Sequence, residues 1–478
     1  MKGITAYGVY LPRLRLNRQA MVEANAWFDS SLKGLGKGER SICNWDEDTI
    51  TMAVEAGIDC LSALQDKSLS GLNLASTTAP FVDRQNSVLV AEAMNLNSQI
   101  RTMDIGSSQR AATSALIAGL ESARPGNEMI IASEHRRTKA GSRAEMLWGD
   151  GAAALTVGDD EVIAQCLAVA TNAVDFVDHY RGEGSDFDYD WEERWIRDEG
   201  WLKLVPDAVA AALQKAGVAA SDVDHMIVPA HMRRVPESVA KRCGVNAEAV
   251  TDPLMHNVGQ CGVAHPLLML CSALANAEAG QIILVTGFGQ GADALVFEVT
   301  AAIANTQPGL GVAGWLDKGV QESNYAKLLT YTGVVEREYG KRAELDRSPV
   351  LTAQYRNRRG VTGFVGGRCT RCGTVQFPKS NYCVNPNCGA KDTQEDHPMS
   401  GVQGVVKTWT ADRLVFSMDP PAYFGLVEFE GGGRTMVDFT EVDPDTFDVG
   451  TATTMRFRVK FVDERRGMRQ YFWKAAPA

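Results

Sequence analysis

The sequence predicts an α/β domain followed by a zinc ribbon and a small β-barrel, and three observations support this fold class. Strand-like and helix-like stretches alternate over residues 2–300, a pattern typical of helices layered on a sheet. Four cysteines lie within residues 369–388, and about five short alternating stretches fill residues 401–475. We therefore expect one large layered domain with two small domains after it.

The composition is that of a folded, acidic protein. The chain has 478 residues, of which 45% are hydrophobic and 22% charged, and this length suits two or three domains. Its 48 Lys and Arg against 59 Asp and Glu give a net charge of −11, which argues against binding of a nucleic-acid backbone. The first residues lack a signal-peptide pattern, and no apolar run is long enough to cross a membrane. We expect a cytoplasmic protein without disulfides.

The N-terminal part alternates regularly between the two kinds of element. Its first strand, KGITAYGVY, alternates and ends at Leu11-Pro12. The first long helix, DEDTITMAVEAGIDCLSAL, begins with an acidic turn and has apolar residues at helical spacing. The expected order is strand 2–10, helix 46–64, strand 72–75, helix 84–95, strand 101–105, helix 110–123, strand 129–133 and strand 149–158.

The same alternation returns after residue 200, which suggests an internal duplication, although the periodicity alone is a weak signal. Its expected elements are helix 203–216, strand 224–230, helix 235–243, helix 263–278, strand 282–288 and strand 294–299. A Gly-containing connector and a polar helix over 322–344 follow. The expected domains are two halves at 1–160 and 161–305, a helical linker at 306–350, the ribbon at 351–395 and the barrel at 396–478.

Two cysteine pairs predict the zinc ribbon. Cys369 and Cys372 are separated by two residues, and Cys383 and Cys388 by four. Each pair can supply two thiolates to one tetrahedral ion, whereas the alternative is four unrelated thiols. Because sulfur would fill all four positions, we expect one structural zinc ion per chain with no open site for catalysis.

The C-terminal stretches GVVKTWT, YFGLVEFE, RTMVDFTEV, TTMRFRVKFVD and RQYFWKA predict a Greek-key barrel of the oligonucleotide/oligosaccharide-binding (OB) type. Nucleic acid is a common ligand of such barrels. The acidic charge balance and the absence of a basic patch argue against that ligand here.

Several motifs of the chain resemble one known family. Residues 1–300 resemble 3-hydroxy-3-methylglutaryl-CoA (HMG-CoA) synthase-like members of the thiolase superfamily, and residues 320–478 look like the zinc-ribbon/OB-fold proteins that accompany such enzymes. The resemblance implies a five-layered αβαβα fold with two pseudo-repeats, a homodimer, acyl-CoA substrates and a partner thiolase. The motifs that carry it are YGVYLPRLRL, DEDTITMAVEA, GDGAAALTVG, DFVDHYR, WEERWIRDEG and GFGQGADA.

Two catalytic positions of that family have changed in this chain. The family's acyl-cysteine falls on Gln109, or on Ser108 if the alignment shifts by one residue. A serine at a helix start is more often a cap than a nucleophile. The family's general-base glutamate falls on Thr77. An acyl-enzyme is therefore unavailable unless Ser108 or a nearby cysteine replaces the missing one.

The third catalytic position is retained. His231 follows the strand MIVPA, where the family has its catalytic histidine; a structural histidine is the alternative. In the next motif, Gln260 aligns with the family's asparagine, and Cys261 lies beside it as a reactive thiol or a buried filler. His265 is the runner-up in this segment, by analogy with the Gly-His-Pro motif of degradative thiolases.

Further candidates lie in two polar segments. His179, within Asp175–Arg181, is a candidate for proton transfer, and a solvated loop is the alternative. A local basic cluster is expected to meet the phosphates of CoA, with a surface ion-pair network as the alternative. Its candidate residues are Arg136, Arg137, Arg143 and Arg233.

The resemblance and the changed residues together suggest a function. We expect an HMG-CoA synthase-like enzyme that makes or breaks a C–C bond alpha to an acyl-CoA thioester, by Claisen/aldol-type condensation or retro-aldol cleavage, without the usual cysteine. CoA enters as part of the substrate, and His231 with backbone N–H groups stabilises an enolate. The alternatives are decarboxylation of a malonyl-type thioester, with Gln109 at the cysteine position, and a non-catalytic CoA-binding scaffold for a partner thiolase.

Overall fold

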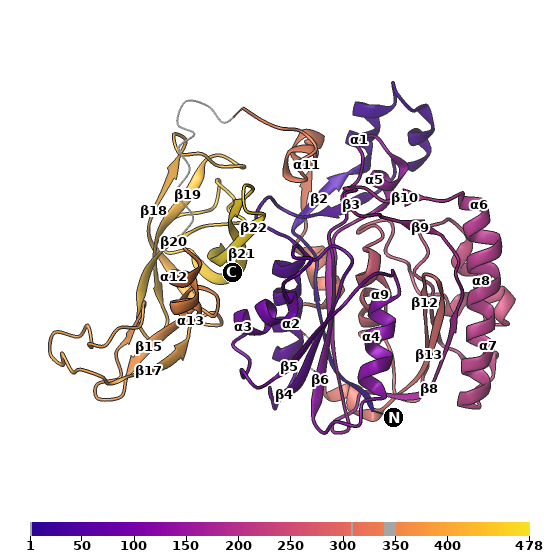
Figure 1. Cartoon of the computed structure of the whole chain (residues 1–478), viewed down its shortest axis with the longest axis horizontal. Coiled ribbons are helices and arrows are strands. Elements are labelled where there is room, and N and C mark those ends of the chain that lie inside the picture. Colours follow the sequence, from indigo (N-terminus) through magenta and orange to yellow (C-terminus); the bar gives the residue numbers. More distant parts are fainter. Residues whose placement is uncertain (1, 307–308, 339–349) are drawn as a thin grey trace. The chain divides into compact units, whose positions relative to one another are not determined.

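The computed structural model describes residues 2–306, 309–338 and 350–478, which form two compact units (Figure 1). The first unit comprises the described residues of 1–44, 48–88 and 99–335. The second comprises residues 45–47, 89–98 and those of 336–478. Among the described residues, no helix has the length and apolar character needed to cross a membrane.

A nine-stranded mixed sheet forms the centre of the first unit. Its order is β11-β12-β13-β8-β1-β7-β6-β4-β5. The strands are β1 (Gly3–Tyr10), β4 (Leu69–Ala75), β5 (Arg101–Ile105), β6 (Asn127–Glu134), β7 (Gly151–Gly158), β8 (Ala164–Ala173), β11 (His225–Ile227), β12 (Ile282–Phe288) and β13 (Gly291–Val299).

The sheet consists of two halves with the same pairing pattern. From its centre outward, one half pairs β1 with β7 and β7 with β6 antiparallel, and then β6 with β4 parallel. The other half pairs β8 with β13 and β13 with β12 antiparallel, and then β12 with β11 parallel. The halves join where β1 pairs with β8. This repetition agrees with the two pseudo-repeats that the resemblance implies.

Helices cover and separate the two halves (Figure 1). Helix α2 (Thr49–Ser62) packs on β1, β6 and β7, and α7 (Val205–Ala216) packs on β8 and β13. Between them, α4 (Ala111–Leu120) and α9 (His265–Leu274) contact each other and strands of both halves. The layers therefore follow the αβαβα order, and the predicted thiolase-type α/β fold is confirmed.

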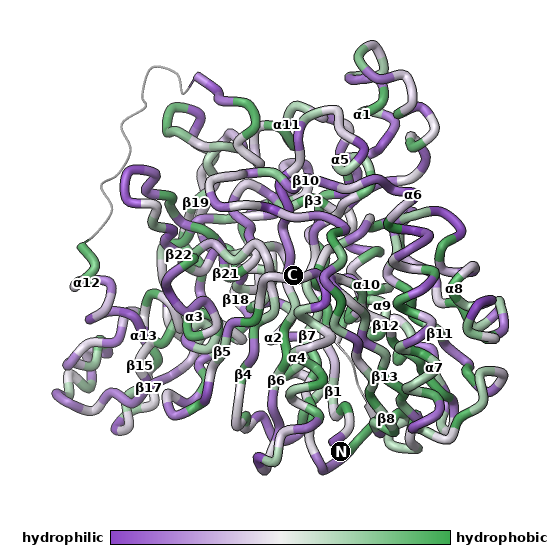
Figure 2. Tube along the Cα trace, turned by 45° about the vertical axis from the view of Figure 1, so that its right-hand side comes forward, coloured by the Kyte–Doolittle hydropathy of each residue, from purple (hydrophilic) through white to green (hydrophobic). Residues whose placement is uncertain are grey.

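The apolar patterns account for this layering. Every residue of β7 is buried, as expected for a central strand of small residues. Helix α2 starts later than predicted, because Asp48 forms a capping box with Thr51 and so leaves residues 46–48 outside the helix. Figure 2 shows hydrophobic residues concentrated along the inner strands and α4, and hydrophilic residues in the peripheral loops.

Other elements lie around this core. Strand β8 was missing from the predicted order, and of the predicted polar helix 322–344 only the part at α11 is helical, while residues 339–344 lie outside the described residues. The remaining elements of the first unit are β2 (Leu14–Asn17), α1 (Arg18–Asn25), β3 (Glu39–Ile42), α3 (Asn86–Ala93, which extends into the second unit), α5 (Arg143–Leu147), β9 (His179–Tyr180), β10 (Tyr189–Asp190), α6 (Glu193–Trp195), a π-helix (Ile196–Leu204), α8 (Val235–Cys243), α10 (Gly311–Asp317), β14 (Val320–Glu322) and α11 (Tyr325–Tyr331).

The second unit holds the ribbon and the barrel. Two short helices precede a three-stranded ribbon sheet, and a five-stranded antiparallel sheet of order β20-β19-β18-β21-β22 follows it. The predicted zinc ribbon and OB fold are thus present. The elements are α12 (Leu351–Arg356), α13 (Arg358–Val361), β15 (Val365–Cys369), β16 (Val375–Gln376), β17 (Gln394–Pro398), β18 (Gly404–Asp412), β19 (Ala422–Phe429), β20 (Arg434–Asp438), β21 (Ala452–Asp463) and β22 (Met468–Pro477).

Buried ion pairs tie residues 45–47 into this second unit. Lys474 Nζ lies 2.8 Å from Asp46 Oδ2, and both side chains are almost fully buried. The same ammonium group lies 4.1 Å from the ring centre of Trp45. Arg458 is likewise buried and lies 3.2 Å from Glu47. A buried charge needs a partner of opposite sign, so these three residues complete the interior of the C-terminal unit.

Candidate active site

The resemblance places the family's nucleophile at Gln109 or Ser108, and both residues lie between β5 and α4. The Oε1 of Gln109 is buried and has no hydrogen-bond partner among the described residues. The neighbouring Ser108 is engaged instead, since its Oγ donates to Gly289 O at 3.1 Å and accepts from the Arg110 N–H at 3.3 Å. A buried amide oxygen without a partner is costly in a folded protein, which marks Gln109 as a position suited to a ligand.

Three side chains converge on Gly262, which begins a short turn before α9. A Cβ added to Gly262 would lie 2.6 Å from Glu134 Cγ, 3.0 Å from Arg136 Cδ and 3.2 Å from Gln109 Oε1. The φ angle of Gly262 is +52°, in the region that favours glycine. The structure therefore brings Gln109 and Glu134 to one point, although the sequence analysis did not single out Glu134.

Glu134 is the last residue of β6 and is fully buried. It accepts hydrogen bonds from the Thr77 hydroxyl at 2.9 Å, from the Thr77 N–H at 3.2 Å and from the Val263 N–H at 3.4 Å. Burial raises the pKa of its carboxyl group. The signal in the sequence was a glutamate at the end of a strand with the apolar run MIIA, and such strand ends commonly carry functional groups.

His231 follows β11, which belongs to the second of the two halves of the sheet. Its pKa is lowered to about 4, chiefly by burial and then by the positive charge of Arg136. The charge of His179 adds to this effect. His179 Nδ1 lies 2.9 Å from Asp178 Oδ2, so this candidate is held by a carboxylate. His231 is therefore neutral near pH 7, with a ring nitrogen able to accept a proton.

The side chains just before α9 and at its start make hydrogen bonds to other parts of the protein. Gln260 Oε1 accepts from the Gly262 N–H at 3.0 Å and from Arg136 Nη1 at 3.3 Å. Cys261 is fully buried, and burial raises the pKa of its thiol well above the ordinary value. His265 Nδ1 accepts from the Cys261 N–H at 3.2 Å, and its Nε2 lies 2.9 Å from Pro253 O. Both nitrogens of His265 are thus used within the fold.

The four arginines of the basic cluster differ in their surroundings. Arg136 is buried, pairs with Asp188 at 2.7 Å and lies 3.3 Å from the ring centre of Trp148. It therefore acts inside the site and not at a phosphate on the surface. The other three keep exposed surface, with Arg137 bonded to Thr332 O and Arg143 paired with Glu193, while Arg233 is exposed.

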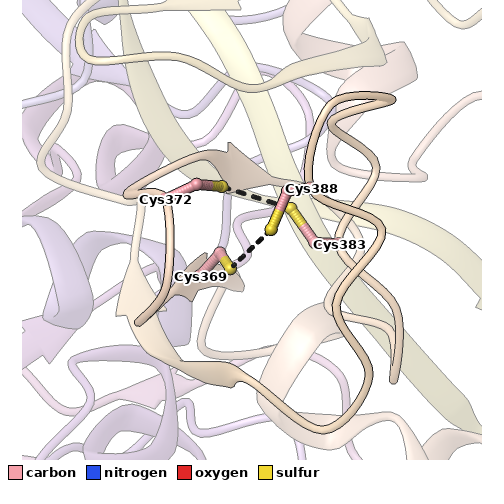
Figure 3. A group of neighbouring side chains, drawn as sticks. All are labelled: Cys369, Cys372, Cys383 and Cys388. Atoms are coloured by element: carbon pink, nitrogen blue, oxygen red, sulfur yellow. Dashed lines mark hydrogen bonds between the residues drawn. The ribbon is translucent and has the colours of Figure 1, made fainter.

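The four ribbon cysteines form a compact group, with their sulfur atoms turned toward one another (Figure 3). Their ligand atoms all lie within 4.8 Å of one another. Cys369 Sγ is 4.0 Å from Cys388 Sγ, and Cys372 Sγ is 3.5 Å from Cys383 Sγ. A tetrahedral zinc ion with bonds of about 2.3 Å would separate its sulfur ligands by about 3.8 Å. The arrangement therefore fits one zinc ion.

Family models match three parts of the chain. Residues 213–298 match the C-terminal domain of 3-oxoacyl-[acyl-carrier-protein] synthase III. Residues 363–394 match the rubredoxin-like zinc ribbon domain of ChsH2, and residues 396–459 match its C-terminal OB-fold domain. These matches agree with the layered α/β core, the cysteine group and the barrel described above.

Curated proteins and solved structures match the first unit. The HMG-CoA synthase of Pyrobaculum aerophilum is 26% identical over 316 residues, which are 64% of this chain and 89% of that protein. The HMG-CoA synthase of Aeropyrum pernix is 26% identical over 322 residues, or 64% and 87% of the two chains. A crystal structure of 3-oxoacyl-[acyl-carrier-protein] synthase III from Aquifex aeolicus has a TM-score of 0.55 at 22% identity and covers 62% of this chain and 100% of its own. An HMG-CoA synthase complexed with CoA has a TM-score of 0.56 at 20% identity and covers 68% of this chain and 89% of its own.

Proposed function

We propose a reaction for this chain from its similarity to HMG-CoA synthases, from its zinc ribbon and OB fold, and from the changed residues of its site. The protein makes or breaks a C–C bond alpha to an acyl-CoA thioester through an enolate, without an acyl-enzyme. The relatives supply the substrate class, since they include an HMG-CoA synthase complexed with CoA. The residues of the site suggest how the reaction proceeds without an acyl-enzyme.

The observation that carries this proposal is the buried amide oxygen of Gln109, which has no hydrogen-bond partner among the described residues. A glutamine side chain cannot accept an acyl group as a cysteine thiolate does. It can instead hold a polar atom of the substrate, for which its Oε1 accepts and its Nε2 donates a hydrogen bond. Cys261 does not replace the missing thiolate in this proposal, because its thiol is buried and its pKa is raised.

Acid–base chemistry is assigned to the groups around this amide. His231, which is neutral, accepts or returns a proton or donates a hydrogen bond to the enolate oxygen. Glu134, whose side chain lies beside Gly262 as that of Gln109 does, takes the second proton-transfer role. Gln260 and Arg136, which are bonded to each other, orient these groups. His179 assists by its charge on His231.

Deuterium exchange tests this proposal without knowledge of the exact acyl group. The full chain is incubated in D2O with acetyl-CoA, and with longer acyl-CoA esters, and the alpha protons are followed by NMR. We expect exchange that depends on enzyme concentration, with no adduct on the protein by intact mass spectrometry. A stable acetyl adduct on Ser108 or Cys261 would contradict the non-covalent mechanism.

A second candidate function is decarboxylation of a malonyl-type thioester. The Gln109 amide favours it, because an amide at this position can occupy the place of an acyl carbonyl. Release of CO2 from malonyl-CoA, without exchange into acetyl-CoA, would favour this reaction. Tight CoA binding with neither activity would favour the non-catalytic scaffold for a partner thiolase.

The remaining expectations complete the proposal. The ribbon holds one structural zinc ion through Cys369, Cys372, Cys383 and Cys388, and the protein is a cytoplasmic homodimer. The phosphates of CoA are bound by the exposed arginines of the basic cluster, namely Arg137, Arg143 and Arg233.

A further inference from the structure

Three potential metal ligands of different chemistry meet in the first unit, away from the ribbon. Cys43 follows β3, His135 follows β6, and Asp150 precedes β7. Their ligand atoms lie within 4.8 Å of one another. Segments up to 107 residues apart in the sequence thus place a thiol, an imidazole and a carboxylate close together.

The spacing of these atoms fits a small tetrahedral ion. His135 Nδ1 lies 3.1 Å from Asp150 Oδ1. Zinc bonds to nitrogen and oxygen of about 2.0 Å would separate two such ligands by about 3.3 Å in a tetrahedron. A zinc–sulfur bond of about 2.3 Å would place the Cys43 sulfur about 3.5 Å from each of them. The ligand atoms lie within 4.8 Å of one another, so the sulfur needs to move by about 1.5 Å at most to reach this distance.

Surrounding hydrogen bonds orient the three ligands. The Cys43 N–H donates to Asp150 Oδ2 at 2.8 Å, which leaves the other oxygen facing His135. The His135 N–H donates to Thr78 Oγ1 at 3.0 Å. Such outer contacts fix the direction of metal ligands in known sites. Cys43 and Asp150 are almost fully buried, while the side chain of His135 is 18% exposed and gives an ion access from solvent.

The chemistry of the donors selects the kind of ion. A thiolate, an imidazole and a carboxylate are the ligands of zinc, whereas magnesium and calcium prefer oxygen alone. The Cys43 thiol now donates to Met52 Sδ at 3.7 Å, and it gives up this contact when the thiolate binds zinc. The charges also balance, since a divalent ion neutralises one thiolate and one carboxylate in a buried place.

We propose that Cys43, His135 and Asp150 bind a second zinc ion, in addition to the ion of the ribbon. On binding, the Cys43 thiol releases its proton to solvent and the sulfur forms a bond to zinc. Three protein ligands leave the fourth position to water. The ion ties together the ends of β3 and β6 and the start of β7.

Metal stoichiometry tests this proposal on the full chain. The protein is loaded with zinc chloride, dialysed against zinc-free buffer, and analysed by elemental mass spectrometry. We expect two zinc ions per chain in the wild type and one in Cys43→Ser, His135→Asn and Asp150→Asn. Cys166→Ser, which removes another buried thiol on β8, should retain two. One zinc ion in the wild type would overturn the proposal, with Asp150 then serving only as the counter-ion of His135.

A second measurement needs no variant and so does not depend on whether the variants fold. Folded wild-type protein is treated with N-ethylmaleimide before and after zinc loading, and the modified cysteines are identified by peptide mass spectrometry. Zinc should slow the modification of Cys43 at least tenfold. A Cys43 thiol that reacts equally fast with and without zinc would overturn the proposal and indicate a thiol activated by His135 instead.

Discussion

The hydroxyl group of Thr77 donates a 2.9 Å hydrogen bond to the carboxylate of Glu134. Thr77 stands where the resemblance places the family's glutamate. In this chain, the threonine at that position is hydrogen-bonded to a glutamate of a neighbouring strand. The register explains the contact, because β4 and β6 are parallel neighbours with Ala75 opposite Ala132. Their carboxyl ends therefore carry Thr77 and Glu134 side by side, and the acidic group has moved by one strand.

Replacing this carboxyl group should reduce catalysis more than binding. Glu134→Gln keeps the size of the side chain and most hydrogen bonds but removes proton transfer, so we expect kcat to fall by about 10²–10⁴-fold with a similar KM for the acyl-CoA. The matched control is Glu128→Gln on the same strand, where Glu128 is buried and bonded to Ser122. Unchanged kcat in a folded Glu134→Gln protein would remove Glu134 from the mechanism.

A methyl group at Gly262 should fill the point where the site converges. The Cβ of Gly262→Ala would lie 2.6 Å from Glu134 Cγ, so the side chain of Glu134 has to move. We expect loss of turnover together with about 1–3 kcal/mol of destabilisation, measured by urea unfolding. Gly280→Ala separates the two causes, because Gly280 also has a positive φ, +89°, but open space at its Cβ. It should lose some stability and no turnover.

A cysteine at position 109 should restore covalent chemistry if the rest of the site still matches the family. Gln109→Cys places a thiol near the N-terminus of α4, where the helix dipole favours a thiolate. We expect one acetyl group on the protein after incubation with acetyl-CoA, located on residue 109 by peptide mass spectrometry. An unmodified variant that still binds CoA would show that the site no longer supports acyl transfer.

The stability of the first unit should depend on pH through His231. Its pKa is about 4 in the folded state against 6.5 for an ordinary histidine, so the unfolded chain binds the additional proton between these values. The unfolding free energy should therefore rise with pH over this window. His231→Gln should reduce that rise, as measured by urea unfolding from pH 4.5 to pH 7. An equal slope in both proteins would contradict the lowered pKa.

Loss of the ribbon zinc should loosen one part of the second unit. In Cys383→Ser, we expect one zinc ion fewer and faster hydrogen exchange over residues 363–398, because the ribbon has only short strands to hold it. Exchange in the strands of the first unit should not change. Cys243→Ser, which alters a thiol of α8, is the matched control. Full protection of the ribbon in metal-free Cys383→Ser would contradict a structural role for zinc.

Sequence patterns predicted most of the layered core. Strands such as β7 and β12 are continuous apolar runs, and helices such as α8 have clear periodicity, so their identity depends on local residues. Strand β8 was missed because polar residues stand near both of its ends, at Gln165 and at Thr171 and Asn172, and leave only a short apolar stretch between them. The cysteine spacing also predicted the ribbon, since its four ligands lie close in the sequence.

The candidate site was predicted only in part. Gln109, His231 and Gln260 stay predictions, which rest on motifs of the resembled family. Glu134 escaped because its role depends on the pairing of β4 with β6, which no local pattern reveals. The group of Cys43, His135 and Asp150 escaped for the same reason, as its members lie on three separate segments.

The pair of Asp46 and Lys474 also bears on how the chain folds. These residues are 428 positions apart, so the C-terminal unit cannot close its interior until both ends of the polypeptide have been made. Contacts of such sequence separation form late, because a very long loop must close first. A fragment that begins at residue 336 would lack Asp46 and Glu47, so that Lys474 loses its carboxylate partner, while Arg458 keeps its pair with Glu441. The C-terminal unit should therefore be less stable as such a fragment than in a chain that includes residues 45–47.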